Sequence, residues 1–325
     1  MRIKHRFATV MQKDMKKSKE IRNILEKYSI KYEYEEENNV LGFHWSLIFF
    51  LYDDMVSFDK IYNTIKPYEF VELLSNEFDK NEMNNAEWYE IVAPSCQYPQ
   101  PDDDWSYYKF TFDTKKWCPY CNVGKIQNNP YRLLKKPKQK STQFWGLFWE
   151  AEALFCGEAI KNIFERENIQ GIHFIQPVNK RGIPFEGYYQ IIMETVLDKG
   201  FIPINRKAIL CDEKTYHKED YQTIIETVFK DFIPTNREMV LCDEKTHHCG
   251  KVKYEPAVGG NNFDKNIFSA KVDFCLSNEW FGSGWQADRL IIISKKVYEI
   301  IKKNKFKGLI IEPIFHNERG ENAST

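Results

Sequence analysis

The chain has 325 residues, of which 42% are hydrophobic and 15% aromatic, which suits one large domain or two ordinary ones. Its 46 basic and 47 acidic side chains give a formal net charge of −1, which excludes a global field that would attract a nucleic-acid backbone. No apolar stretch of signal-peptide length follows the basic residues 1–6, and the most apolar run, Leu47–Tyr52, is about half the length of a membrane span. We therefore expect a cytoplasmic protein that does not contact a membrane.

The N-terminal third predicts a mixture of helices and strands. Apolar residues at helical spacing predict a helix over residues 10–28, and alternation over 30–35 predicts a strand that ends in a polar turn at 36–39. The run at 47–52 predicts a buried strand or a core helix. Residues 55–80 predict an amphipathic helix that Pro67 bounds or kinks.

A boundary is expected near residue 106. Three prolines and three consecutive aspartates predict a loop over residues 94–106, and the alternation at 107–112 predicts a strand that leads into a cysteine pair. We therefore divide the chain into an N-terminal α+β region at 1–106 and a C-terminal region at 107–325.

Two internal similarities occur in the C-terminal region. Residues 194–217 and 226–248 are closely similar, which indicates a recent local duplication. Residues 160–178 and 297–314 share a looser pattern, in which a short amphipathic helix turns at a glycine into an apolar strand. The predicted fold class is α+β, with helix–strand units around a mixed or antiparallel sheet and an embedded zinc-ribbon-like element.

The eight cysteines favour metal binding or burial over disulfides, because a chain of this size without a signal peptide is expected in a reducing compartment. Cys118-Pro119-Tyr120-Cys121 is a C-x-x-C pair whose two thiolates can reach one tetrahedral zinc ion. The best second half-site lies at residues 242–254, where Cys249-Gly250 resembles the end of a zinc knuckle. Thr246 stands three residues earlier, where the first cysteine of this second motif is expected, so Cys242 or His247 would have to complete the site.

Other interpretations of these cysteines remain open. A redox pair normally opens a helix, and the Asn122–Gly124 turn that follows argues against one. Two buried, unligated cysteines are the second alternative, and a structural zinc site, intact or degenerate, is favoured over both. Cys96, Cys156 and Cys275 are expected in the core.

An aromatic segment, Trp280–Trp285, surrounds a Gly-Ser-Gly sequence that lacks the lysine of a phosphate-binding loop. We expect Trp280 and Trp285 to bind a partner protein, although packing against the core is the alternative. His44 is expected to be a strand histidine with satisfied hydrogen bonds, Asp53 a strand end, and the aspartates 102–104 a solvated turn.

A resemblance to a known family rests on several of these features. The Cys118–Cys121 pair, the Cys249–Tyr254 segment, the helix–glycine–strand units and the segments at 149–155 and 283–314 resemble the double-CXXCG motif proteins. These are bacterial proteins related to the immunity proteins of polymorphic toxin systems. The resemblance covers residues 107–325, and Asn122 and Thr246 depart from the motif.

The resemblance implies a non-enzymatic protein that binds and neutralises a cognate protein toxin and contains structural zinc. Two rival functions remain open. One is a zinc-ribbon protein associated with nucleic acid in defence or regulation, although the charge balance makes nucleic acid an unfavoured partner. The other is a metal-dependent hydrolase whose site the sequence does not reveal.

Overall fold

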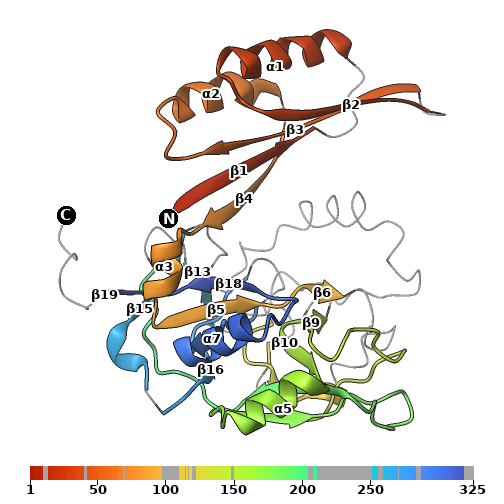
Figure 1. The fold of residues 1–325 in the computed structure, drawn as a ribbon, viewed down its shortest axis with the longest axis vertical. Helices are drawn as coiled ribbons and strands as arrows, with labels where there is room; N and C mark the ends of the chain where they lie inside the picture. Colours follow the sequence, from red (N-terminus) through yellow and green to blue (C-terminus); the bar gives the residue numbers. More distant parts are fainter. Residues whose placement is uncertain are drawn as a thin grey trace, which may run out of the picture. The chain divides into compact units, whose positions relative to one another are not determined.

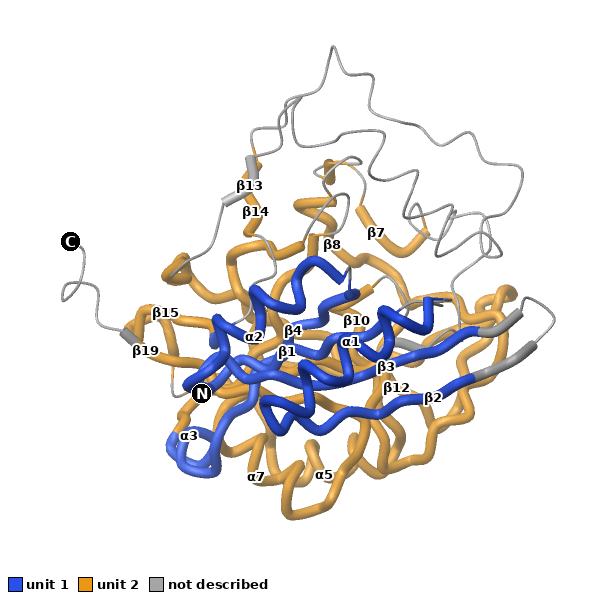
Figure 2. Tube along the Cα trace, turned by 90° about the horizontal axis from the view of Figure 1, so that it is seen from above, with its two compact units in different colours: residues 1–85, 257–260 blue, residues 86–256, 261–325 orange. Residues whose placement is uncertain are grey.

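The structure is a computed structural model of an α+β protein with mostly antiparallel sheets. It describes residues 1–9, 14–39, 42–68, 70–96, 110–113, 115, 117–118, 122–147, 150–203, 208–210, 251–254, 259–269, 271–282 and 287–317. The chain forms two compact units, which Figure 2 colours separately: unit 1 contains Met1–Asn85 and Ala257–Gly260, and unit 2 contains Ala86–Pro256 and Asn261–Thr325. The units divide at residue 85, whereas the sequence prediction placed a boundary at 106.

Unit 1 has the order β1 (Arg2–Ala8), α1 (Met15–Lys27), β2 (Tyr32–Asn39), β3 (Gly42–Tyr52), α2 (Phe58–Ile65), the 3-10 turn η1 (Lys66–Tyr68), β4 (Val71–Glu77) and α3 (Lys80–Asn85). Its strands form one antiparallel sheet in the order β2-β3-β1-β4. This is a split β-α-β arrangement. Figure 1 shows α1 and α2 together on one face of the sheet.

The alternation of β3 explains how this face is covered. Trp45, Leu47, Phe49 and Leu51 are each at most 1% exposed and pack with residues of α1 and α2. The apolar run at 47–52 is thus an interior strand, as one of the two predictions for it had it. Within the described residues, no helix has the length and apolar character needed to span a membrane.

Two predictions for unit 1 need correction. The polar residues at 36–39 continue β2 instead of forming a turn, because each pairs with a residue of β3. The predicted helix at 55–80 ends at Tyr68, and residues 71–77 form β4. Pro67 terminates the helical segment, and the seven residues of β4 then find backbone partners along β1. The helix predicted at 10–28 is confirmed over Met15–Lys27.

Unit 2 contains two larger sheets. The first has the order β11-β12-β10-β9-β6, formed by β6 (Ser95–Cys96), β9 (Phe144–Leu147), β10 (Glu150–Gly157), β11 (Ile172–Ile175) and β12 (Tyr188–Met193). The second has the order β16-β17-β5-β18, formed by β5 (Trp88–Val92), β16 (Phe274–Leu276), β17 (Ile291–Ser294) and β18 (Ile310–Pro313). The helices α5 (Glu158–Arg166) and α7 (Lys295–Lys303) follow β10 and β17.

Three smaller pairs complete unit 2. They are β7 (Phe112–Asp113) with β8 (Ile126–Gln127), β13 (Ala208–Leu210) with β14 (Val252–Tyr254), and β15 (Asn262–Asp264) with β19 (Phe315–Asn317). A 3-10 turn, η2 (Lys265–Ile267), follows β15. Of the duplicated segments, residues 204–207, 211–217 and 226–248 lie outside the described residues.

The two sheets of unit 2 are built to the same plan. A separation of 137 residues relates the start of α5 to that of α7, Asn168 to Lys305, and Gly171 to Gly308; these last four residues all have positive φ. Each of these two segments consists of a β-hairpin, a helix, a left-handed turn, a glycine and a strand, in that order. The predicted helix–glycine–strand similarity is therefore confirmed, and it extends to the preceding hairpin.

We divide unit 2 into a first repeat at residues 86–175 and a second repeat at residues 188–313, and the first strand of each repeat joins the sheet of the other. Ile191 of β12 lies opposite Leu154 and Phe174, and Ile91 of β5 lies opposite Ile291 and Ile311 in the same register. The strand β5 begins the first repeat but completes the sheet of the second. The strand β12 begins the second repeat but completes the sheet of the first. Each half of unit 2 therefore lacks a strand that the other half supplies.

Two glycines allow the backbones of the two halves to approach closely enough to form hydrogen bonds. The amide of Phe144 donates to the carbonyl of Lys307 at 2.8 Å, and the amide of Phe274 donates to the carbonyl of Gln170 at 3.1 Å. A Cβ at Gly308 would lie 2.1 Å from the Phe144 carbonyl oxygen, and one at Gly171 would lie 2.4 Å from that of Phe274. Only glycine permits both the positive φ and this close backbone approach.

Substitution of Gly308 by alanine should test this junction. Gly182 also has positive φ, at 79°, but a Cβ there meets nothing within 4 Å. Gly182→Ala should cost about 1–2 kcal/mol through backbone strain alone. Gly308→Ala should cost at least about 3 kcal/mol, because overpacking adds to the same strain. Urea unfolding of both variants measures the difference, and equal losses would contradict the close approach.

Candidate functional site

The structure describes two of the predicted site residues, Cys118 and Trp280. The other predicted metal ligands, Cys121, Cys242, His247 and Cys249, and the second tryptophan, Trp285, lie outside the described residues. Within the part of the chain that is described, no group of three or more His, Cys, Asp or Glu side chains is placed to hold a metal ion. The aspartates 102–104 also lie outside it.

Cys118 begins a closed turn between β7 and β8. Its amide donates to the Val123 carbonyl at 3.0 Å, and its carbonyl accepts from the Asn122 amide at 2.9 Å. Asn122 has φ 61°, a left-handed conformation that asparagine tolerates better than most residues. The side chain of Asn122 also accepts from the Trp117 indole at 2.6 Å. Asparagine thus adopts the backbone form that a glycine would supply at the fifth position of a C-x-x-C-G turn.

The thiol of Cys118 is 3% exposed and forms no disulfide. The turn that carries it also contacts the second repeat, because Lys251 Nζ donates to the Val123 carbonyl at 3.1 Å. Val123 therefore joins Cys118 to a residue that is two positions after Cys249 in the sequence. The two sequence segments predicted to form a split site are adjacent at this point.

A buried ion cluster lies beside this turn. Lys125 Nζ donates to Glu150 Oε2 at 2.7 Å and to Asp288 Oδ1 at 3.1 Å, and the Lys125 and Glu150 side chains are 2% and 0% exposed. Lys125 belongs to the turn, Glu150 to the first repeat and Asp288 to the second. One ammonium therefore bridges three parts of unit 2.

A second ion pair extends the cluster. The Arg289 guanidinium binds both carboxylate oxygens of Glu152, with the shortest contact 2.8 Å. The 137-residue relation makes Glu152 and Arg289 equivalent positions of the two repeats, so the pair joins the repeats directly. Burial raises the pKa of Asp288, and the nearby Glu152 adds to the rise while the Lys125 ammonium opposes it.

Trp280 packs against this cluster from one side. The guanidinium of Arg289 lies 5.0 Å from the centre of the Trp280 ring, in cation–π geometry. The Trp280 carbonyl accepts from the Tyr254 amide at 2.8 Å, which connects β14 to the same region. The Trp280 residue is partly exposed, so part of its surface stays accessible.

The remaining described cysteines belong to the core, as predicted. Cys156 and Cys275 are 0% exposed. Burial raises the pKa of both thiols, to about 12 for Cys275. Thiols with such pKa values stay protonated near neutral pH and do not favour metal binding. The side chain of Cys96 lies outside the description.

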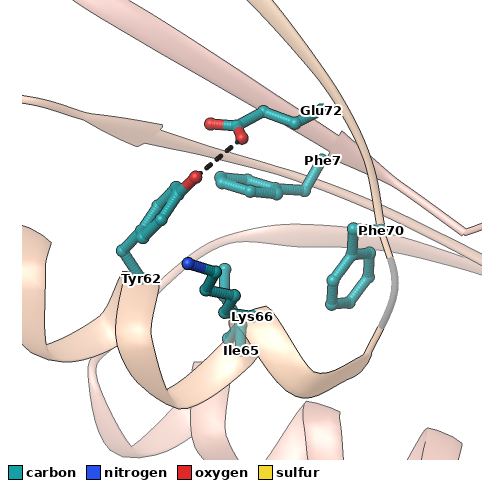
Figure 3. Close-up of a pocket in the computed structure, with 6 residues that line it drawn as sticks. All are labelled: Phe7, Tyr62, Ile65, Lys66, Phe70 and Glu72. Atoms are coloured by element: carbon teal, nitrogen blue, oxygen red, sulfur yellow. Dashed lines mark hydrogen bonds between the residues drawn. The ribbon is translucent and has the colours of Figure 1, made fainter.

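Unit 1 has a small pocket of about 90 Å³, shown in Figure 3. It is lined by Phe7, Tyr62, Ile65, Lys66, Phe70 and Glu72. The Tyr62 hydroxyl donates to Glu72 at 2.9 Å, which raises the pKa of Tyr62, and His5 contacts the other Glu72 oxygen. This volume accommodates a few water molecules, so the pocket is too small for a substrate of ordinary size.

Two other predicted residues have structural roles. His44 is 7% exposed within β3, as expected of a strand histidine, but its Nδ1 has no hydrogen-bond partner within the described residues, so the expectation that its polar atoms are satisfied is wrong. Asp53 follows β3, and its carboxylate accepts from the Ile3 amide at 2.7 Å, as expected at a strand end.

Comparison of the chain with models of protein families, with curated proteins and with solved structures finds no match.

The buried ion cluster was missed by the sequence analysis. Its only sequence signal is a set of charged residues within otherwise apolar strands, such as Glu150 and Glu152 in the EAEALFC segment of β10. Charge at these positions is visible in the sequence, whereas burial and partnership are not.

Replacement of Lys125 by methionine should be strongly destabilising. The variant removes the cation beside the fully buried Glu150, and breaking a buried pair from one side costs about 3–5 kcal/mol. Lys161→Met is the matched control, because Lys161 pairs with the exposed Glu165 at an i, i+4 spacing; it should cost about 0.3–0.5 kcal/mol. Chemical denaturation of the two variants provides the comparison, and similar losses would show that the cluster is not a buried junction.

Proposed function

We propose that this chain is a non-enzymatic bacterial interaction protein of the immunity type. It acts in the cytoplasm, where it binds and neutralises a cognate protein toxin. Its C-terminal region is held together by a structural zinc ion in a zinc-ribbon-like site. The observation that carries the metal part of this proposal is the Cys118 turn and its contact with Lys251.

The chemistry of the turn fits a thiolate ligand of zinc. Cys118 is buried, and the left-handed Asn122 closes the backbone after the C-x-x-C pair in the way that a knuckle requires. The departure of Asn122 from the family motif is therefore conservative. Cys118 and Cys121 form one half of the proposed ligand set.

The second half of the ligand set comes from Cys249 and either Cys242 or His247. Sequence spacing supports this pairing. Lys125 follows Cys121 by four residues and lies beside β8, and Lys253 follows Cys249 by four residues in β14. Both lysines are 2% exposed. Equivalent lysines at equal spacing support the assignment of Cys121 and Cys249 to equivalent positions of the two repeats.

A site of this kind would stabilise the fold and would not catalyse a reaction. A thiolate-rich, four-coordinate zinc has no open position for water, and structural zinc supplies roughly 10–16 kcal/mol near neutral pH. Because the proposed ligands come from both repeats, the ion would join the same halves that the buried Lys125 cluster joins.

The partner-binding part of the proposal rests on the family resemblance and on Trp280. A large aromatic side chain that is partly exposed and held against Arg289 is a typical binding anchor. Trp285, five residues further on, is the second proposed anchor.

Metal content tests the zinc site. Cys118→Ser should lower zinc per chain and thermal stability together, because it removes a ligand. Cys156→Ala is the matched control, since Cys156 is also a buried free thiol but lies in the core of β10; it should leave zinc content unchanged. Atomic emission of the purified proteins gives the ratio. Full folding and equal metal content in both variants would remove the zinc site from the account.

Toxin neutralisation is tested by co-expression with the product of the gene next to the one that encodes this chain. The intact chain should restore growth to cells that express a toxic neighbour. Trp280→Ala should weaken binding by about 2 kcal/mol or more, as for a buried interface anchor, with Val56→Ala, a fully exposed residue of unit 1, as the control. A neighbour product that is toxic but neither bound nor neutralised would contradict the immunity role.

A further inference from the structure

The edge strand β4 of unit 1 exposes three apolar side chains. It ends the sheet order β2-β3-β1-β4, so one side of its backbone has no strand partner within the described sheet. Val71, Leu73 and Leu74 are 45%, 53% and 46% exposed, and the strand contains neither lysine nor proline. Edges of this kind are templates for pairing with another strand, and proteins normally protect them.

The opposite edge of the same sheet is protected. The strand β2 has the sequence YEYEEENN, with four glutamates in eight residues. Glu33, Glu35 and Glu36 are exposed. Charge along an edge discourages pairing with another strand. The β2 edge of this sheet is therefore protected, whereas the β4 edge exposes apolar side chains.

The charges of β4 do not provide such protection, because they are already paired. Glu72 accepts from the Tyr62 hydroxyl and contacts His5. Glu77 binds the Arg2 guanidinium at 2.8 Å and Lys4 at 3.3 Å. The outer edge of β4 is therefore unprotected over residues 71–75, where the exposed apolar side chains lie. It ends before Asn76, because the Asn76 side chain accepts from the Gly259 amide at 2.8 Å.

We propose that β4 pairs with β4 of a second copy of this chain, antiparallel about a two-fold axis, to form one continuous eight-stranded sheet. An arrangement centred on Leu73 sets Leu73 opposite Leu73, Val71 opposite Ser75, and Glu72 opposite Leu74. No like charges then face each other across the junction. The strand is therefore compatible with itself as a partner, as an isologous interface requires.

The arrangement closes at two copies. Each chain has one apolar edge and one acidic edge in this sheet, so the described part of the sheet offers no second apolar edge to extend a filament. Leu73 lies opposite Arg6 of β1, so the pairing would add a second Leu73 to the cross-strand row that already holds Arg6 and Phe50. A ladder of about five residues buries less than a standard interface of about 1,600 Å². Association should therefore depend on concentration.

Sedimentation of the full chain over a wide concentration range tests the proposal. The mass should rise from that of one chain, 38.8 kDa, towards twice that value. Leu73→Lys, which adds a protecting charge to the edge, should remain a single chain at every concentration. Val56→Lys, which adds the same charge at a fully exposed position outside the strands, should associate like the unmodified chain.

Hydrogen exchange of the unmodified chain provides a second measurement that needs no variant. Amides at residues 71–75 should exchange more slowly at high concentration. A single chain throughout, with no change in exchange, would overturn the proposal and leave the edge for a strand of a different protein. A dimer that persists in Leu73→Lys with unchanged exchange in β4 would overturn it as well.

Discussion

Neither half of unit 2 can complete its own sheet. The strand β5 begins the first repeat and pairs with β17 and β18 of the second, and β12 begins the second repeat and pairs with β10 and β11 of the first. A strand added between two others supplies backbone bonds on both sides, so its loss exposes two rows of polar groups. The exchange therefore makes the stability of each half depend on the other.

The buried ion pairs of unit 2 lie between the two repeats, whose sheets depend on each other. Lys125 joins the Cys118 turn to Glu150 of one repeat and Asp288 of the other, and the Glu152–Arg289 pair connects equivalent positions of the two. Buried ion pairs add little net stability but penalise every alternative in which one partner is missing. A metal ion bound by cysteines of both repeats would act in the same direction and at the same junction.

Local features of this fold were predictable, and long-range ones were not. The helix–glycine–strand segments around α5 and α7 were predicted from the sequence, because helical periodicity, a left-handed turn and a glycine are local signals. The exchange of β5 and β12 was not, because five- and six-residue strands carry no information about which distant strand they join. The helix predicted through residues 71–77 failed because apolar spacing fits both periods in a short segment, and pairing with β1 decided the outcome.

The candidate site shows the same limit. The C-x-x-C pair identified Cys118, but the adjacent Lys125 cluster depends on burial that the sequence does not display.

Native-state hydrogen exchange of the full chain tests the central claim, that strand exchange makes unit 2 one cooperative structure, most directly. Amides of β5 and β12 should open with the same free energy, together with β10 and β17, because neither sheet can persist without the strand from the other half. If the β9–β12 sheet opened at a clearly lower free energy while β5, β17 and β18 stayed protected, the two halves would be independent and the account would be wrong.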